Sequence, residues 1–271
     1  MNTYKFKYLS FAIVIIVISQ CFIIPQHQTK QYKKNNIYLT EIPNLEIPNY
    51  KFNCTILKRK YYTLCYNNNL YQPNWVAYKL EYRMLNNIYS RKNIKFQKDP
   101  SPNINSALPS DYTKSGYDRG HLCPAGDMKF NLEALKETFY MPNISPQVPQ
   151  FNRGIWKDLE EKIREWVNND SSICYIVTGP IFNNDINKKI KNIYVPKYFY
   201  KVILKYSVKN NEINGIGFIF ENKTYKSNLV NYAITIDSVE KFTSIDFFYL
   251  LPDSIENKCE KTLNINKWFK K

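Results

Sequence analysis

Strand-like segments lie on both sides of one strongly amphipathic helical segment, and this order constrains the fold more than any other feature. The apolar residues of the helical segment recur at helical spacing: Ile155, Trp156, Leu159, Ile163, Trp166 and Val167. Strands are expected within residues 52–66 and at residues 73–80, 173–180, 195–204 and 215–220, and shorter helices at residues 132–139 and 236–243. Strands precede, interrupt and follow helices without a regular strand–helix–strand repeat. This order favours the α+β class over a doubly wound parallel sheet.

The N-terminal segment has the pattern of an export or anchoring signal. Two lysines precede an apolar run over residues 9–18, which resumes at residues 22–24 and ends at Pro25. The run is longer than the core of a usual signal peptide and just short of the roughly 20 residues that span a bilayer. Residues 1–25 are interpreted as a signal peptide or as a membrane anchor through residues 8–24. In either case we expect an exported protein that is periplasmic, extracellular or membrane-anchored.

The rest of the chain divides into a tether and one domain. Residues 26–49 are polar and repeat Ile-Pro-Asn, which predicts an extended tether. The domain is expected over residues 50–271. Its composition, with 44% apolar and 16% aromatic residues over the whole chain, excludes a disordered protein.

The chain is strongly basic, with 38 Lys and Arg against 23 Asp and Glu and a formal net charge of +15. Such a charge attracts polyanions, for example nucleic acids or an anionic membrane surface. The chain is also rich in Asn, Ile and Tyr, a composition that accompanies A- and T-rich coding sequences and that inflates Lys as well. The charge therefore permits a nucleic-acid substrate without establishing one.

The cysteines indicate a disulfide and no zinc site. If the segment at residues 52–66 is a hairpin that turns near Arg59 and Lys60, Cys54 and Cys65 face each other and can form a disulfide in an exported protein. Three other cysteines lack metal-ligand spacing and histidine partners: Cys123, Cys174 and Cys259.

The chain has only two histidines, and one of them, His27, lies just past the apolar N-terminal run. His121 is therefore the only imidazole available to the domain. It lies in a segment rich in Gly, Pro and charged residues, which predicts a loop within reach of solvent and substrate. The ordinary histidine pKa of about 6.5 suits proton transfer near neutrality. From this residue alone, a simple surface histidine is the alternative.

The segment Asp118-Arg119-Gly120-His121 resembles the signature of the DNA/RNA non-specific endonucleases, the ββα-metal nucleases, in which this motif carries the catalytic histidine. Similar Trp-Val-Ala-Tyr and Val-Thr-Gly-Pro strands occur in that family, here at residues 75–78 and 177–180. The resemblance covers residues 50–270. It implies a mixed, mostly antiparallel central sheet flanked by helices, a ββα-metal active site and, as in many members, a homodimer.

The resemblance also assigns a metal ligand. Asn152 follows the motif histidine by 31 positions, where the family has the sole direct protein ligand of Mg²⁺. Mn²⁺ or another divalent ion can substitute. One neutral ligand suits Mg²⁺, which keeps most of its waters and also binds substrate phosphate. The alternative for Asn152 is a helix N-cap, for which Asn is well suited.

Two further site residues of the family fall on Asn143 and Glu160, upstream and downstream of Asn152. On an ideal helix Glu160 lies about two turns beyond Asn152 and about 80° round the axis. We therefore expect Glu160 to orient a water molecule beside the ion and not to bind the ion itself. Glu161 is the competing candidate for this role.

Three charged residues complete the expected site. Arg119 is expected to contribute a fixed positive charge to the phosphate, and Asp118 to orient its neighbours. Arg91 precedes Asp99-Pro100, which resembles the position of a phosphate-binding arginine in the family. The alternative for Arg91 is a solvated basic loop.

Together these residues predict a metal-dependent endonuclease that hydrolyses phosphodiester bonds of DNA and RNA. His121 would be the general base, Mg²⁺ on Asn152 would stabilise the leaving oxygen, and the products would carry 5′ phosphates. Contacts to the phosphate backbone imply little sequence specificity. Activity should fall as the pH drops through the His121 pKa. The alternatives are a catalytically silent nucleic-acid-binding protein on the same scaffold and a phosphodiesterase for small nucleotides.

Overall fold

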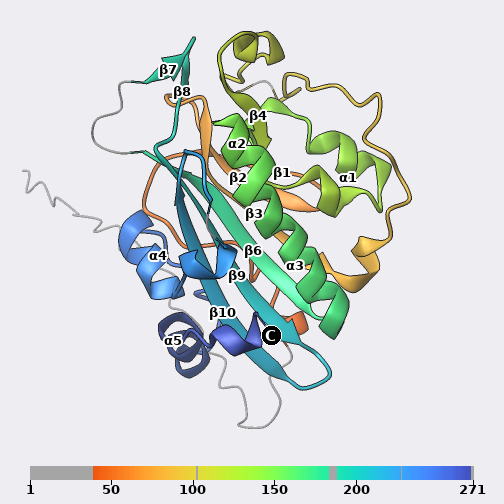
Figure 1. Ribbon diagram of the computed structural model, residues 1–271, viewed down its shortest axis with the longest axis vertical. Coiled ribbons are helices and arrows are strands. Elements are labelled where there is room, and N and C mark those ends of the chain that lie inside the picture. The colour runs from red at the N-terminus through yellow and green to blue at the C-terminus, as the bar shows by residue number, and fades with distance from the viewer. Residues whose placement is uncertain (1–38, 102, 183–187, 227, 270–271) are drawn as a thin grey trace, which may run out of the picture. The chain divides into compact units, whose positions relative to one another are not determined.

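A seven-stranded antiparallel sheet forms the centre of the domain (Figure 1). The computed structural model describes residues 39–101, 103–182, 188–226 and 228–269. The strands lie side by side in chain order: β1 (Thr55–Lys58), β2 (Tyr62–Asn67), β3 (Gln72–Glu81), β6 (Ile173–Ile181), β9 (Tyr198–Ser207), β10 (Glu212–Glu221) and β11 (Ala233–Ile234). Every neighbouring pair is antiparallel. The prediction of an α+β fold with a mostly antiparallel sheet is confirmed.

In the described part of the chain, five α-helices and two small ribbons surround this sheet. The helices are α1 (Leu132–Glu137), α2 (Pro149–Phe151), α3 (Lys157–Asp170), α4 (Ile236–Thr243) and α5 (Asp253–Lys261), and a π-helical turn at Asn152–Trp156 joins α2 to α3. The ribbons pair β4 (Asp118–His121) with β5 (Ile144–Gln147) and β7 (Lys189–Ile190) with β8 (Ile193–Tyr194). Short 3₁₀ turns connect several of these elements.

The long helix α3 packs on one face of the sheet, as its sequence pattern predicts. Its residues Leu159, Ile163 and Val167 are fully buried. They belong to the same core cluster as Ile216 and Phe218 of β10. Figure 1 shows α3 running along this face of the sheet. Burial of the apolar stripe fixes the start of the helix, and with it Asn152, beside the ribbon of β4 and β5.

Helices α4 and α5 pack on the opposite face of β10. Successive side chains of a strand point to opposite faces, and the positions between the core residues of β10 are Gly215 and Gly217. A Cβ atom at Gly215 would lie 2.5 Å from the Cys259 carbonyl oxygen of α5, and one at Gly217 would lie 2.5 Å from Cγ2 of Val239 in α4. The two glycines therefore let both helices approach the strand closely.

The hairpin at the start of the domain forms with the expected disulfide. Cys54 and Cys65 are bonded, which confirms that prediction. The register differs from the expected one, because Cys65 of β2 pairs with Ile56 and Cys54 lies just before β1. A register shift between Cys65 and Tyr66 accompanies this arrangement. The disulfide thus ties the segment preceding β1 to the sheet.

Two boundaries differ from the sequence prediction. Residues 39–49 were expected to be part of the tether, but Leu39 and Leu45 are fully buried. Asn49 pairs with Asp246 through two backbone hydrogen bonds. A few apolar side chains are enough to bury this stretch against the domain, although most of its residues are polar. The expected strand at residues 195–204 begins later, at Tyr198, since Pro196 has no N–H for the ladder.

The predicted signal or anchor, residues 1–25, and most of the predicted tether lie outside the described residues. Among the helices that the structure does describe, none is long and apolar enough to cross a membrane.

Candidate active site

The motif Asp118–His121 forms strand β4, not the loop expected from its sequence. It pairs with β5, with Asp118 opposite Gln147 and His121 opposite Ile144. Strand geometry directs Arg119 and His121 to one side of the ribbon and Asp118 to the other. One side of the strand therefore makes the contacts of Arg119 and His121, and the other side makes those of Asp118.

The imidazole of His121 packs against two phenylalanine rings, which also pack against each other. Its centroid lies 5.3 Å from that of Phe96 and 5.0 Å from that of Phe139. Its Nε2 atom is buried and has no hydrogen-bond partner among the described residues. Burial, and to a lesser extent the charge of Arg91, lower the pKa of His121 from 6.5 to about 3. The imidazole is therefore neutral at pH 7, the state in which it can accept a proton.

Two arginines lie over the phenylalanine rings that contact this histidine. The Arg91 guanidinium lies 5.6 Å from the centroid of Phe139, and that of Arg119 lies 5.4 Å from the centroid of Phe96. Arg119 also donates hydrogen bonds to the Pro109 carbonyl oxygen, at 3.2 Å from Nε and 2.7 Å from Nη2. The structure thus brings Arg91, Arg119 and His121 together, although 28 residues separate the two arginines in the sequence.

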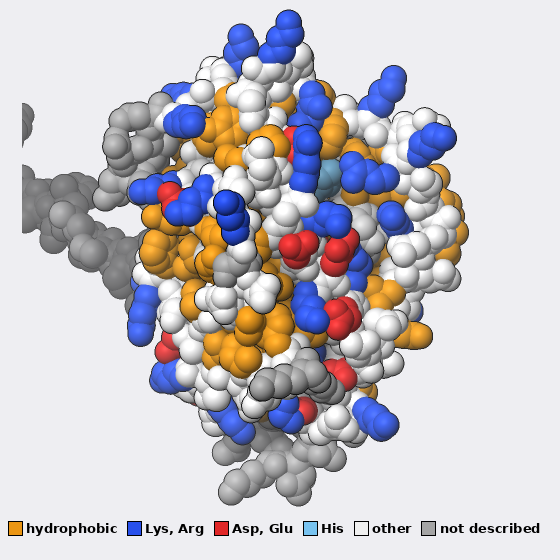
Figure 2. Space-filling view, viewed as in Figure 1, with side chains coloured by type: hydrophobic (Ala, Val, Ile, Leu, Met, Phe, Trp, Pro, Cys, Tyr) orange, Lys and Arg blue, Asp and Glu red, His pale blue; other side chains and the backbone are white. Residues whose placement is uncertain are grey.

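This part of the molecule presents positive charge to solvent. Figure 2 shows the pale-blue histidine side chain at the surface, with Lys and Arg side chains around it. Part of the His121 ring is therefore accessible even though Nε2 is buried. A phosphate that approaches this ring meets positively charged side chains.

On the other side of β4, Asp118 holds the residue predicted to bind metal. Asn152 donates from Nδ2 to Oδ2 of Asp118 at 2.9 Å. Arg153 donates to both oxygens of the same carboxylate, at 2.8 Å from Nε and 2.7 Å from Nη2. Burial raises the pKa of Asp118, but the hydrogen bonds from Arg153 and Asn152 outweigh it and lower the pKa below 3.8. The ionised carboxylate therefore fixes the amide nitrogen of Asn152.

This hydrogen bond is a direct test of whether Asn152 fits a metal ion. An amide turned by its nitrogen toward Asp118 presents its carbonyl oxygen on the other side. A neutral oxygen ligand of this kind suits Mg²⁺, which retains several of its waters. The donor set therefore fits a hydrated divalent ion.

Asn152 is not the N-cap that the alternative interpretation assumed. It has helical φ and ψ of −59° and −43°, and its backbone N–H bonds to the Val148 carbonyl oxygen at 2.9 Å. Its side chain reaches Asp118 and not a helix N–H group. The widened π-helical turn that follows contains Gly154, at φ −106° and ψ −118°. The ideal-helix relation between Asn152 and Glu160 therefore does not hold.

Asn143 is buried and bonds only to the backbone. Its Oδ1 accepts from the Cys123 N–H, and its Nδ2 donates to the carbonyl oxygens of Cys123 and Thr138, each at 2.9 Å. These bonds join the segment after His121 to Thr138, which follows the end of α1 and directly precedes Phe139. Its contacts are those of a residue that positions the histidine, and not of one that faces substrate.

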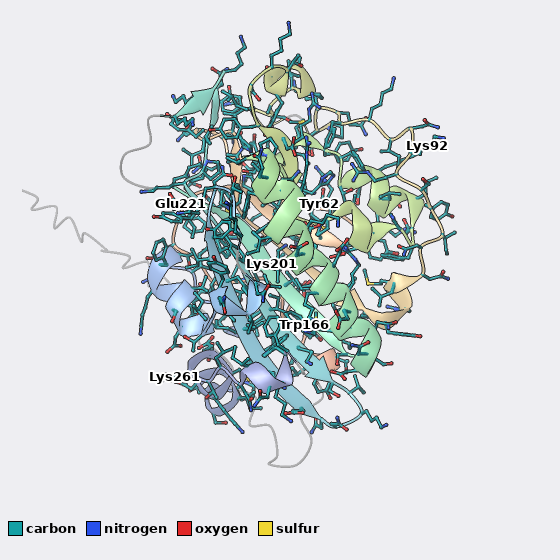
Figure 3. The ribbon with its side chains drawn as sticks, viewed as in Figure 1. Tyr62, Lys92, Trp166, Lys201, Glu221 and Lys261 are labelled. Carbon is teal, nitrogen blue, oxygen red and sulfur yellow. A yellow bond between two sulfur atoms is a disulfide. The ribbon has the colours of Figure 1, made fainter. Side chains whose placement is uncertain are left out.

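Glu160 lies above a buried lysine that the sequence analysis missed. Lys201 of β9 is fully buried, with its Nζ 3.5 Å from the Leu122 carbonyl oxygen and 4.5 Å from the centroid of Trp156. Figure 3 places Lys201 in the interior, where α3 crosses the sheet. Burial raises the pKa of Glu160, and the charge of Lys201 opposes that rise most strongly. Glu161, the competing candidate, instead forms a surface ion pair with Lys157 at 2.8 Å.

A buried ion pair supports this region. Arg164 of α3 donates to Oδ1 of Asp127 at 2.6 Å, and the Tyr78 hydroxyl donates to Oδ2 of the same carboxylate at 3.0 Å. Asp127 is 1% exposed, so its charge depends on these partners. The only sequence signal for this network was the position of polar residues inside otherwise apolar patterns, as at Lys201 within its strand.

A neutral base, fixed positive charge and an oriented oxygen ligand together suit hydrolysis of a phosphate ester. In agreement, the sequence model of the DNA/RNA non-specific endonucleases matches residues 43–254. The chain belongs to this family, as its motif predicted, and a divalent metal ion is part of the chemistry of such nucleases.

Named relatives and one solved structure agree with this assignment. The chain is 35% identical over 216 residues to the mitochondrial nuclease EXOG of Mus musculus, an alignment that covers 73% of the chain and 58% of EXOG. It is 30% identical over 220 residues to a nuclease of Nostoc, which covers 77% of the chain and 78% of that protein. The solved EndoG/EndoGI complex contains a chain with a TM-score of 0.65 and 27% identity, with 73% of this chain and 86% of that chain covered. The chain thus spans about three fifths of the mouse EXOG length.

Proposed function

We propose that this protein is a metal-dependent endonuclease that hydrolyses phosphodiester bonds of DNA and RNA with little sequence specificity and leaves 5′ phosphates. The observation that carries the proposal is the neutral imidazole of His121, which packs on Phe96 and Phe139, the rings that Arg119 and Arg91 also contact. Family membership supports the same reaction.

In this proposal His121 is the general base. Its neutral imidazole removes a proton from the attacking water, and the two phenylalanine rings hold it in one orientation. Arg91 and Arg119 balance the negative charge of the scissile phosphate. None of these groups reads a base edge, so the recognised feature is the phosphate backbone that DNA and RNA share.

Asn152 is the residue that would hold the metal ion, which we take to be Mg²⁺, with Mn²⁺ or another divalent ion able to replace it. When bound, such an ion supplies charge stabilisation at the phosphate and the leaving oxygen. Asp118 is a positioning residue, because it fixes the Asn152 amide through a 2.9 Å hydrogen bond. Glu160 orients water near this ligand, and the charge of Lys201 limits the rise in the Glu160 pKa that burial causes.

We also propose that the protein is exported and acts as a homodimer. The Cys54–Cys65 disulfide supports export, since disulfides persist in oxidising compartments. Residues 8–24 would serve as the signal or the membrane tether. Analysis of the N-terminus of the secreted or membrane fraction separates a cleaved signal from an anchor, and light scattering of the purified chain gives the number of subunits.

The test is cleavage of supercoiled plasmid and of a structured RNA by the purified full chain, with Mg²⁺ and with EDTA. We expect cleavage of both substrates, abolished by EDTA and by His121→Ala. Salt-sensitive binding of both substrates without cleavage would instead show a silent nucleic-acid-binding protein. Hydrolysis of small nucleotides alone, insensitive to salt, would show a small-nucleotide phosphodiesterase.

A further inference from the structure

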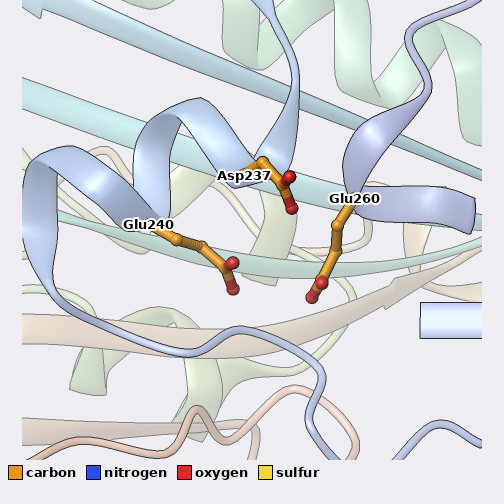
Figure 4. A group of neighbouring side chains, drawn as sticks. All are labelled: Asp237, Glu240 and Glu260. Carbon is orange, nitrogen blue, oxygen red and sulfur yellow. The ribbon is translucent and has the colours of Figure 1, made fainter. Parts of the chain in front are cut away.

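Helices α4 and α5 bring three carboxylates together on the sheet face opposite α3. Asp237 and Glu240 come from α4 and Glu260 from α5, and one oxygen of each lies within 4.8 Å of the others. Figure 4 shows the three carboxylates directed toward a common space between the helices. Glu260 also belongs to a second group of the same kind, with Asp246 and Glu256.

No cationic side chain neutralises this group. Within the described residues, none of these five carboxylates forms an ion pair with a lysine or arginine. The charges that act most strongly on Glu240 and Glu260 are those of other carboxylates. The chain has 38 Lys and Arg against 23 Asp and Glu, so the lack of partners is not a shortage of cations.

Glu260 gives an independent indication of a ligand. Its side chain is 9% exposed, and its Oε1 atom is buried without a hydrogen-bond partner among the described residues. A buried carboxylate oxygen that has lost its water and found no donor is costly, so most such groups are paired or bind a metal. This oxygen belongs to the carboxylate that Figure 4 shows facing Asp237 and Glu240.

The two helices hold these carboxylates in place. Gly215 and Gly217 let α5 and α4 lie directly on β10. Oε1 of Glu240 accepts a 2.8 Å hydrogen bond from the Phe247 N–H, and the Glu240 side chain also hydrogen-bonds to Glu260, so two contacts fix its position. The oxygens therefore come from ordered elements packed on the sheet, and not from an exposed loop.

We propose that Asp237, Glu240 and Glu260 bind a Ca²⁺ ion that joins α4 to α5. Ca²⁺ takes carboxylate oxygens at about 2.3–2.6 Å, so ligands on opposite sides of the ion are about 4.6–5.2 Å apart. Oxygens that all lie within 4.8 Å of one another can contact a single ion of this size. Three negative ligands distinguish this site from Asn152, whose single neutral oxygen suits Mg²⁺.

The competing explanation is that protons, and not a metal ion, neutralise the group. Burial and the neighbouring carboxylates raise the pKa of Glu240 to about 7 and that of Glu260 to about 9. Without Ca²⁺, the group would therefore hold protons near neutrality. Binding of Ca²⁺ would release them, so the two explanations differ in whether added Ca²⁺ changes the protein at constant pH.

The experiment is calorimetric titration of the full chain with CaCl₂ in the Asn152→Ala background, which removes the proposed active-site ligand. We expect one Ca²⁺ to bind and, at a hundredfold excess over Kd, to raise Tm by about 5 °C or more. Adding Glu260→Gln or Asp237→Asn should abolish both effects. The matched control is Asp253→Asn, an exposed acid of α5 outside both groups, which should change neither.

Each other outcome decides against the proposal. Absence of Ca²⁺ binding in Asn152→Ala would leave protons as the neutralising species. Binding that Glu256→Gln abolishes and Asp237→Asn spares would move the ion to the second group. Glu260→Gln should also raise Tm in EDTA near neutral pH, because the folded protein then no longer has to take up a proton at this position. If that variant does not fold, Asp237→Asn, at a partly exposed position, provides the same test.

Discussion

Carboxylates are arranged in opposite ways at the catalytic ribbon and at helices α4 and α5. Near the ribbon three buried or half-buried acids form ion pairs: Asp118 with Arg153, Asp127 with Arg164 and Asp99 with Arg59. The charge of Lys201 also acts on Glu160. At α4 and α5 the described acids form no such ion pairs. In the first arrangement, side chains of the protein itself neutralise the acids and orient catalytic groups. In the second, the carboxylates need a cation from solution to neutralise them.

The largest expected effect is the loss of the one neutral base at the catalytic ribbon. His121→Ala should reduce kcat by about a thousandfold or more, because general base catalysis supplies factors of about 10²–10⁴. Plasmid nicking measures this loss, while filter binding of the same plasmid should be unchanged. His27→Ala, which removes the only other histidine, is the control and should keep full activity. Similar losses in both variants would remove His121 from the mechanism.

The next effect tests whether the stability of the buried acids near the catalytic ribbon depends on neighbouring cations. Lys201→Met should lower the free energy of unfolding by about 1–3 kcal/mol. Burial already raises the pKa of Glu160 to about 7, and loss of the Lys201 charge raises it further, so the folded protein must hold this buried carboxyl in its protonated form. Urea denaturation measures the change. Adding Glu160→Gln should restore most of the loss, because glutamine needs no proton to be neutral.

Lys205→Met is the matched control on the same strand. Lys205 is also buried, but its partner Asp170, at 2.9 Å, is 30% exposed and can be hydrated. The cost should therefore be smaller, and Glu160→Gln should not restore it. Equal rescue of both lysine variants would mean that Glu160 is not specifically coupled to Lys201.

The sequence identified the chemistry of the catalytic ribbon but not its surroundings. The Asp-Arg-Gly-His motif, Asn152 and Arg91 are identifiable because their residue types and order resemble a family pattern. That Phe96 and Phe139 enclose His121 depends on pairing between distant segments, such as the isolated bridge between Gln97 and Tyr140. No local pattern encodes such a contact.

Local pattern also misplaced two features for identifiable reasons. Glycine and proline near His121 predicted a loop, but pairing with β5, more than twenty residues later, forms a strand. The helix was expected to be regular from Phe151, and the π-helical turn at Asn152–Trp156 changes its phase. The acids of α4 and α5 drew no interpretation, since Glu240 and Glu260 are separated by twenty residues and meet only through tertiary packing.

A smaller effect is expected when the carboxylate that orients Asn152 loses its charge. Asp118→Asn should weaken the apparent affinity for Mg²⁺ by about 10–100-fold, as for other residues that orient metal ligands, with a lesser change in kcat at saturating Mg²⁺. The Mg²⁺ dependence of nicking gives both quantities. Arg153→Gln leaves the Asp118–Asn152 bond in place and should have a weaker effect. An unchanged Mg²⁺ dependence in Asp118→Asn would refute the positioning role.

The pH dependence of catalysis tests the environment of His121. Because burial lowers the His121 pKa to about 3, the neutral base persists well below pH 6.5, and kcat/KM should retain most of its value at pH 5. A histidine with an ordinary pKa would lose about thirtyfold there. The phosphate of bound substrate offsets the positive charge of Arg91, which lowers the His121 pKa in the free enzyme. The His121 pKa should therefore be higher in the complex, and kcat should begin to fall at a higher pH than kcat/KM. A limb near pH 6.5 in kcat/KM that persists in Glu160→Gln would contradict the burial of Nε2.

The smallest effect is expected for Glu256, an acid of α5 without an ion-pair partner among the described residues. Burial and neighbouring acids raise the pKa of Glu256 from 4.5 to about 7. The folded state therefore favours the protonated form, and this acid contributes stability below pH 4.5 that is lost as the pH rises through 7. In EDTA, Glu256→Gln should stabilise the protein at pH 8 by up to about 1 kcal/mol, since solvent screens a partly exposed charge, and should change nothing at pH 4.

Glu165→Gln supplies the contrast, because Glu165 of α3 pairs with Lys162 at 2.9 Å. Its removal should slightly destabilise the protein at pH 8, opposite in sign to Glu256→Gln and within the small range of surface ion pairs. Urea denaturation at the two pH values measures both variants. Destabilisation by Glu256→Gln at pH 8 would mean that this acid has a favourable partner in the folded chain. The contrast between the paired acids near the ribbon and the unpaired acids of α4 and α5 would then not hold, and the case for a cation bound at these helices would be weakened.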